Sequence, residues 1–269
     1  MQHILVGVDG SDYGLIAAEY ALEFAGAAND DIEAVGIIPA ALFNALGKTQ
    51  DELAYSQEVL DGEHLARRAV KDWFAEAEGL CEAAGVCFGR SIDVGDPADR
   101  LPLLATAAKL VVFGARGATG GPGIGRVAAA MYDRAVKPMM VTKTQYRPIK
   151  RVLIGWDGGP GAAHAAGMIY GPAKAKGWDV TIVVGAPQTS PEAESASFVA
   201  REMAAGGCNT TLHVRNAEAR TLVLDSVREF DADLIAIGAR KPGAAEALIF
   251  GSAWREIVEN VEIPVLLHR

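Results

Sequence analysis

The feature that most constrains the fold is an internal repeat that covers the whole chain. Asp9 and Asp157 each follow a short apolar segment and lie 148 residues apart. Gly114 and Gly238 also end matching apolar segments, but they lie 124 residues apart, because the second copy lacks much of a long helical stretch in the middle. Matching residues at near-constant spacing indicate two copies of one domain in tandem.

Each copy alternates apolar strand segments with helical segments, and we place the copies at residues 1–146 and 147–269. This alternation is typical of an α/β domain with a parallel sheet flanked by helices, so we predict two tandem Rossmann-like domains with five parallel strands each. The expected strands cover residues 3–8, 32–38, 86–94, 110–113 and 138–143 in the first copy, and 151–156, 179–184, 210–215, 234–237 and 263–268 in the second.

The helices expected between these strands follow an apolar period close to 3.6 residues. They are rich in alanine, glutamate and leucine, and the longest of them has a charged face that we expect to be solvated. The expected helices cover residues 13–25, 51–84, 98–108, 126–136, 162–176, 191–205 and 219–230, and one more follows residue 252.

Composition limits the classes of partner. A net charge of −9 disfavours nucleic acid and anionic membrane as the main partners. We expect no membrane span, because the chain has no run of about 18 apolar residues. The three cysteines, Cys81, Cys87 and Cys208, form no C-x-x-C motif, and this odd number favours a reducing cytoplasm over a disulfide framework.

The ends of the first and fourth strands indicate a binding crevice in each copy. In sheets of this kind, ligands bind beyond the carboxyl ends of the strands, where the chain order reverses. Asp9 and Gly114 stand at these ends in the first copy, and Asp157 and Gly238 in the second. A carboxylate suits the base or ribose of a nucleotide, and a glycine-rich loop before a helix suits its phosphates.

Both copies resemble the universal stress protein family, and the whole chain looks like its tandem form. Nucleotide-binding members of that family carry a glycine, two residues, a second glycine, nine residues, and then a glycine followed by Ser or Thr. The second copy fits this spacing with Gly238, Lys241 and Gly251-Ser252, except that a lysine replaces the middle glycine. Since a change in loop length is hard to compensate, this spacing favours the second copy as the one that binds nucleotide.

The first copy departs from the family pattern differently. It keeps Gly114 and Gly117, but only seven residues separate Gly117 from Gly125, and Arg126 stands where Ser or Thr is expected. It also keeps the turns D-G-S at residues 9–11 and G-D-P-A at 95–98. The second copy reads D-G-G-P at 157–160 and R-N-A-E at 215–218, which we align with these turns.

The resemblance implies that one or both crevices bind ATP or a related adenine nucleotide, with Mg²⁺ as a companion ion. It places Asp9 and Asp157 near the base or ribose, and the backbone of Ile37 and Gly185 near the adenine. The residues that would surround the phosphates are Gly114, Arg116, Gly117, Gly125 and Arg126 in the first copy, and Gly238, Arg240, Gly251 and Ser252 in the second.

Structural explanations exist for the same residues. Asp9 and Asp157 are also expected as N-caps of the helices that follow them, and Ser252 is a good N-cap as well. Arg126 is explained equally well as a solvated surface residue, and the glycines of its loop as a simple connection. These explanations remain open at the level of sequence.

We predict no catalytic residues and no metal site. The five histidines are scattered, and the chain has no metal-binding spacing, nucleophile elbow or P-loop lysine motif. Together with the resemblance, this implies a cytoplasmic stress-response protein that binds an adenine nucleotide as a sensor or regulator, with at most weak ATP hydrolysis. The alternative is a tandem stress protein that does not bind nucleotide and acts as a protein-interaction module.

The last strand of each copy is apolar and needs a partner, because an open apolar edge promotes aggregation. We predict that residues 138–143 lie beside residues 264–268, so that the two copies pair within one molecule as a pseudo-dimer. Homodimerisation of the full chain stays open.

Overall fold

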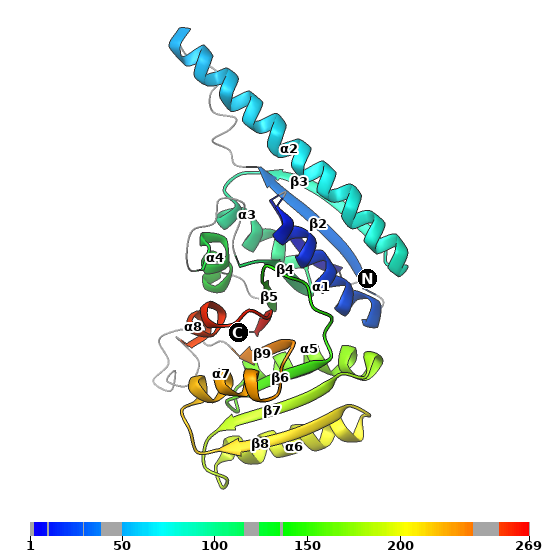
Figure 1. Ribbon diagram of the computed structural model, residues 1–269, viewed down its shortest axis with the longest axis vertical. Coiled ribbons are helices and arrows are strands. Elements are labelled where there is room, and N and C mark those ends of the chain that lie inside the picture. Colours follow the sequence, from blue (N-terminus) through cyan, green and yellow to red (C-terminus); the bar gives the residue numbers. More distant parts are fainter. Residues whose placement is uncertain are drawn as a thin grey trace. The chain divides into compact units, whose positions relative to one another are not determined.

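The computed structural model describes residues 3–9, 11–28, 30–38, 50–115, 124–134, 137–238 and 253–268. The chain divides into two compact units, Met1–Val136 and Lys137–Arg269. Each unit has parallel strands between helices, which confirms the α/β class and the tandem organisation predicted from the repeat (Figure 1). None of the helices within these ranges is both long and apolar enough to cross a membrane.

The first unit contains four parallel strands in the order β3-β2-β1-β4. The two central strands are apolar and buried, as expected when helices cover both faces of a sheet. The strands are β1 (His3–Val8), β2 (Asp31–Ile38), β3 (Phe88–Val94) and β4 (Leu110–Gly114).

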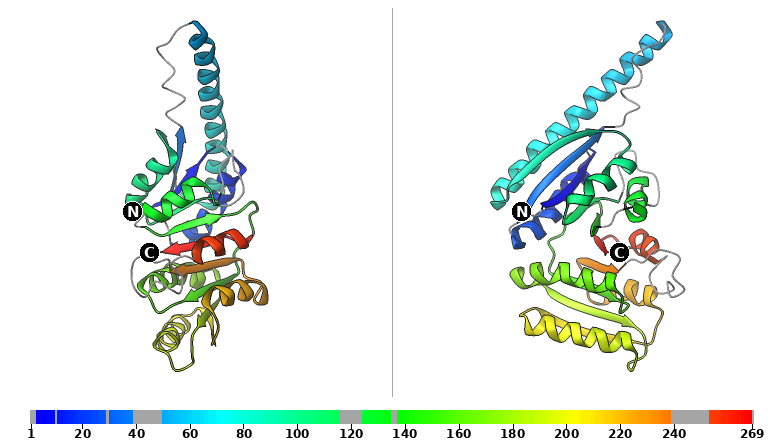
Figure 2. Two further views of the ribbon diagram at one scale, coloured as in Figure 1. Left: turned by 90° about the vertical axis from the view of Figure 1, so that its left-hand side faces the viewer. Right: turned by 180° about the vertical axis from the view of Figure 1, so that it is seen from behind.

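Helices cover the two faces of this sheet in pairs. These are α1 (Asp12–Ala28) and α2 (Gln50–Ala84) on one face, and α3 (Pro97–Leu104) and α4 (Arg126–Arg134) on the other (Figure 2). Gly36 of β2 faces Val70 of α2, and Gly7 of β1 faces Leu101 of α3. Since Gly36 is paired with Val8, the neighbour of Gly7, these two glycines point to opposite faces of the sheet.

Helix α2 has 35 residues and is the segment that the second copy shortens. Its second half packs on the sheet through a buried stripe, while its first half runs on past the ends of β2 and β3 (Figure 1). The stripe consists of Val70, Trp73, Phe74, Ala77 and Cys81. The charged residues predicted to form a solvated face lie partly at 51–66, where side chains are outside the described set.

The second unit repeats this order, with parallel neighbours β10-β9-β6-β7-β8. Its helices cover both faces, with α5 (Pro160–Lys176) and α6 (Pro191–Ala205) on one side and α7 (Ala219–Glu229) and α8 (Ala253–Asn260) on the other (Figure 2). The strands are β6 (Arg151–Trp156), β7 (Asp179–Gly185), β8 (Asn209–Arg215), β9 (Leu234–Gly238) and β10 (Val265–His268).

A sixth strand in the second unit is β5 (Met139–Thr142), which pairs antiparallel with β10. Val141 lies opposite Val265, and Met139 lies opposite Leu267. Residues 138–143 and 264–268 therefore pair as predicted, whereas the pairing of the two copies as a pseudo-dimer stays a prediction. The pairing of β5 with β10 also explains why β5 falls into the second unit, although the repeat assigns it to the first copy.

A buried carboxylate anchors the segment that leads into β6. Asp233 is 1% exposed and accepts hydrogen bonds from the backbone N–H groups of Lys150, at 3.1 Å, and Arg151, at 2.9 Å. The Nε of Arg147 lies 2.6 Å from the same carboxylate. These contacts hold the segment from Arg147 to Arg151 against the residue that precedes β9.

Candidate nucleotide site

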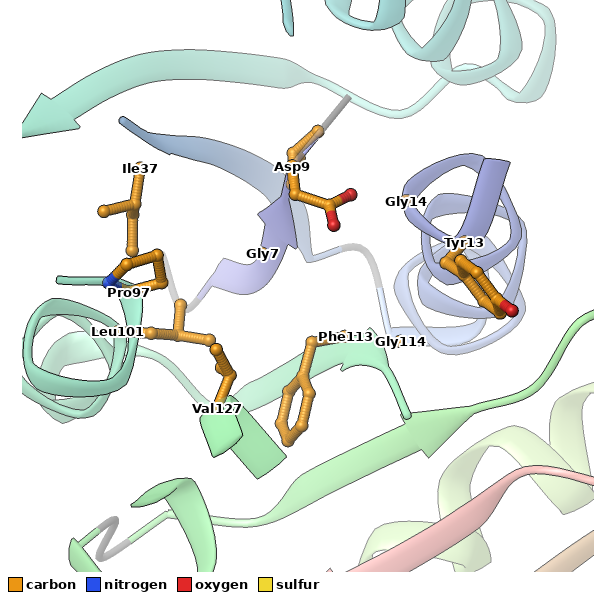
Figure 3. Close-up of a pocket in the computed structure, with 11 residues that line it drawn as sticks. Gly7, Asp9, Tyr13, Gly14, Ile37, Pro97, Leu101, Phe113, Gly114 and Val127 are labelled. Atoms are coloured by element: carbon orange, nitrogen blue, oxygen red, sulfur yellow. The ribbon is translucent and has the colours of Figure 1, made fainter. Parts of the chain in front are cut away.

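The first unit has a pocket at the carboxyl ends of β1, β2 and β4, which encloses about 80 Å³ (Figure 3). Asp9, Ile37 and Gly114, three of the residues selected from the sequence, all line it. The position agrees with the rule that ligands bind beyond the carboxyl ends of parallel strands. The remaining lining residues are Gly7, Val8, Tyr13, Gly14, Pro97, Leu101, Phe113 and Val127.

The walls of the pocket are mainly apolar. Ile37, Leu101, Phe113 and Val127 come from four different elements and gather along one side, while the Asp9 carboxylate lies nearer to α1 (Figure 3). A mainly apolar pocket that is also lined by a carboxylate fits a ring system that carries hydroxyl groups. Sequence motifs did not single out Tyr13, Leu101, Phe113 or Val127, because their meeting depends on how the strands and helices pack.

Asp9 also shapes the turn before α1. Its Oδ1 accepts a hydrogen bond from the Ser11 N–H at 3.0 Å and another from the Ser11 hydroxyl at 2.5 Å. Both bonds close the turn that precedes Asp12, the first residue of α1, so neither of them caps a first-turn N–H group of the helix. In the second copy, Asp157 Oδ1 accepts from the Gly159 N–H at 2.8 Å, so the turn is kept although the sequence changes from D-G-S to D-G-G. Gly159 is itself the N-cap of α5, so the expectation that Asp157 caps this helix is wrong.

Asp96 and Arg126 connect the first turns of α3 and α4. Asp96 is the N-cap of α3, and its Oδ1 accepts from the Ala98 N–H at 2.9 Å. The same oxygen lies 2.8 Å from Nη2 of Arg126, the first residue of α4. The Ala98 N–H, followed by the Arg126 guanidinium, holds the pKa of Asp96 below its usual range. Arg126, which the sequence predicts near phosphate, is thus paired with a carboxylate.

Gly125 lies next to this pair. Its N–H donates to the carbonyl of Ala115 at 3.0 Å, and its own carbonyl accepts from the Ala129 N–H. These bonds join the end of β4 to the start of α4. Arg126 follows directly, and Val127, one residue further, lines the pocket.

Gly185 and Gly238 of the second copy lie close to the backbone of neighbouring segments. A Cβ on Gly185 would lie 2.8 Å from the Ala217 carbonyl oxygen and 2.9 Å from the Cα of Ala219. A Cβ on Gly238 would lie 2.4 Å from the Ala162 backbone nitrogen. Both positions therefore require glycine, because the first turns of α7 and α5 approach the strand ends closely.

The strand ends differ further between the copies. Gly185 has the place in the repeat that Ile37 has in the first copy, where the isoleucine lines the pocket. Trp156 has the place of Val8, is 3% exposed, and donates from its indole to the Ser195 Oγ of α6 at 3.0 Å. The space around these strand ends is therefore filled differently in the two copies.

Five of the residues predicted to contact phosphate lie outside the described residues, and their role stays a prediction. They are Arg116, Gly117, Arg240, Gly251 and Ser252. Among the residues that the structure does describe, no three His, Cys, Asp or Glu side chains are grouped so as to hold a metal ion.

Comparison with known proteins agrees with the tandem fold. The model of the universal stress protein family matches residues 1–143 and again residues 148–269. A universal stress protein of Synechocystis sp. is 24% identical over the full length of both chains.

Solved structures show the same fold at low sequence identity. A universal stress protein from Archaeoglobus fulgidus DSM 4304 superposes with a TM-score of 0.73 and 19% identity, covering 99% of this chain and 98% of its own. One described as a putative universal stress protein from Pseudomonas aeruginosa has a TM-score of 0.63 and 19% identity, covering 100% and 93%. Since the family model matches both copies, the chain belongs to the universal stress protein family.

Proposed function

We propose that the first copy, rather than the second copy that the loop length favoured, binds ATP or a related adenine nucleotide, and that the protein acts in the stress response as a sensor or regulator. One observation carries the proposal: Asp9, Ile37 and Gly114, far apart in the sequence, line the same pocket at the strand ends. The family match supports it, because the resemblance noted above implies nucleotide binding at these positions.

The chemistry of the pocket suits the adenosine part of such a ligand. The apolar side chains of Ile37, Leu101 and Phe113 offer a dry surface to a purine ring. The Asp9 carboxylate is an acceptor for ribose hydroxyls. The enclosed volume of about 80 Å³ is smaller than the ~300–1,000 Å³ of complete small-molecule sites. We therefore place only the base inside, with the phosphates directed toward the start of α4.

Two further parts of the proposal concern the surroundings of the protein. Mg²⁺ would accompany the phosphates as a counter-ion carried by the nucleotide. We place the protein in the cytoplasm, because Cys81, Cys87 and Cys208 are all free thiols and a reducing compartment keeps them so.

Isothermal titration of the full chain with ATP and with adenosine tests the proposal. Ile37→Trp, which fills the pocket, is expected to abolish binding of both ligands. Leu103→Trp is the matched control, since Leu103 is on α3 but is 60% exposed and does not line the pocket. Absence of saturable heat with the unmodified chain would overturn the proposal and leave the protein-interaction module. Equal binding by Ile37→Trp would show that this pocket is not the site.

A further inference from the structure

The pair formed by Asp96 and Arg126 lies at the rim of the pocket in the first copy. Asp96 directly precedes Pro97, and Arg126 directly precedes Val127, and both of these neighbours line the pocket. The pair therefore stands where α3 and α4 begin, on the side toward which the proposed function directs the phosphates.

The two partners depend on each other to different degrees. The Ala98 N–H also donates to Asp96, at 2.9 Å, and this hydrogen bond does not depend on the position of the Arg126 side chain. The Arg126 side chain is 74% exposed, whereas that of Asp96 is 34% exposed. Exposed ion pairs of this kind contribute little to stability, so the Arg126 guanidinium can leave Asp96 at small cost.

A phosphate is a stronger partner for Arg126 than the carboxylate. Guanidinium and phosphate match in geometry and can form two parallel charge-assisted hydrogen bonds. The same phosphate would be repelled by Asp96, since both are anionic. Asp96 therefore opposes phosphate binding in two ways, by occupying Arg126 and by its own charge.

We propose that Asp96 is a specificity-determining residue of the pocket, which competes with the ligand phosphate for Arg126. The inference rests on the proposed function of the first copy, and it concerns how much the phosphate groups contribute to the affinity of the ligand. Adenosine binds without displacing anything from Arg126. A nucleotide gains the Arg126 contact only by displacing Asp96, so Asp96 lowers the preference for phosphorylated ligands.

Two substitutions separate the roles of the partners. Asn is as good an N-cap as Asp, so Asp96→Asn keeps the start of α3 while it removes the charge. Arg126→Gln removes the cation and leaves the hydrogen bond from the Ala98 N–H to the Asp96 carboxylate in place. The matched control is Asp99→Asn, because Asp99 pairs with Arg134 between the same two helices, and neither residue lines the pocket.

The test is titration of the full chain and its variants with adenosine, AMP and ATP. For Asp96→Asn we expect ATP to bind about threefold more tightly, as for removal of a partly exposed charge pair. For Arg126→Gln we expect ATP to bind about tenfold more weakly, as for loss of a charge-assisted hydrogen bond. Adenosine affinity stays unchanged in both variants, and Asp99→Asn changes neither affinity.

The decisive readout is the double variant. In the Arg126→Gln background, Asp96→Asn is expected to keep only the part of its effect on ATP that comes from the charge of Asp96, because the competition for Arg126 no longer exists. Equal shifts for adenosine and ATP, or full effects of Asp96→Asn without Arg126, would overturn the inference while leaving nucleotide binding intact. Failure of the unmodified chain to bind adenosine and ATP would overturn the proposed function and this inference together. Urea denaturation of each variant verifies that it is folded.

Discussion

Asp96 and Glu218 occupy equivalent positions in the two copies, and they cap the equivalent helices α3 and α7. Asp96 comes three residues after Asp93, which pairs with Ile37, and Glu218 comes three residues after Arg215, which pairs with Gly185. Asp96 accepts from the Ala98 N–H, and the Glu218 carboxylate accepts from the N–H groups of Arg220, at 3.1 Å, and Thr221, at 2.9 Å. Both copies therefore have an acidic N-cap at this position, although the sequence of the turn differs between them.

Glu218→Ala is predicted to weaken the start of α7. Loss of a side-chain cap costs about 1 kcal/mol, and the N–H groups of Arg220 and Thr221 lose their acceptor. Hydrogen exchange of these two amides is expected to become faster, whereas amides of α5 keep their rates. Unchanged exchange at both positions would show that the cap is not needed in solution.

Acid is predicted to loosen the same helix. The Thr221 hydroxyl, ahead of the other donors, lowers the pKa of Glu218 from its ordinary 4.5. A lowered folded-state pKa means that the stabilisation is complete above pH 4.5 and is lost as the pH falls through the folded value. Arg215 lowers the pKa of Glu229 as well, so part of the loss of stability in acid is expected to remain in Glu218→Gln.

The check is the thermal midpoint between about pH 6 and pH 3, within the range where carboxylates titrate. The thermal midpoint of the unmodified chain is expected to fall further over this pH interval than that of Glu218→Gln. Identical pH profiles would contradict the role assigned to the Glu218 carboxylate.

Gly238→Ala is predicted to destabilise the second unit by about 2 kcal/mol, because the new methyl group would meet the backbone of Gly161 and Ala162. Gly167→Ala in α5 is the control: its Cβ meets nothing within 4 Å, and alanine in an exposed helix position should add about 0.5 kcal/mol. The unfolding midpoints in urea should therefore move in opposite directions. A harmless Gly238→Ala would remove the packing reason for this glycine.

Asp233→Asn is predicted to cost about 2 kcal/mol, since a buried carboxylate with charged and backbone donors loses its charge. The matched variant is Asp231→Asn, which loses an ion pair with Arg147 and Arg151 on a side chain that is 65% exposed. Asn tolerates the positive φ of Asp231, and the expected cost is below about 1 kcal/mol. Equal costs in urea denaturation would contradict the anchoring role of Asp233.

Local signals explain why the elements were predictable from the sequence. Helix α6 was expected at residues 191–205 and forms there, because Ser190 caps it by accepting from the Ala193 N–H at 3.2 Å and Pro191 takes the first helical position. The helix expected at 98–108 is less regular. It ends at Leu104 and continues as a 3₁₀ turn over Ala105–Ala107, after Pro102, which lacks the N–H that a helix interior uses.

The candidate site was only partly predictable. Asp9, Ile37 and Gly114 end strands, so their meeting follows from the parallel order of the sheet. Leu101 joins them through packing of α3 on the sheet, which no spacing in the sequence expresses. Glu218 was missed because residues 215–218 were aligned with 95–98 without knowledge of the strand register, which shifts the match by two residues.

A crystal structure of the full chain with ATP at saturating concentration tests the central claim most directly. We predict the adenine between Ile37, Leu101 and Phe113, with the ribose at Asp9 and a phosphate within hydrogen-bond distance of Arg126. A pocket that stays empty while ATP is bound elsewhere, or while no ATP is bound at all, would contradict it.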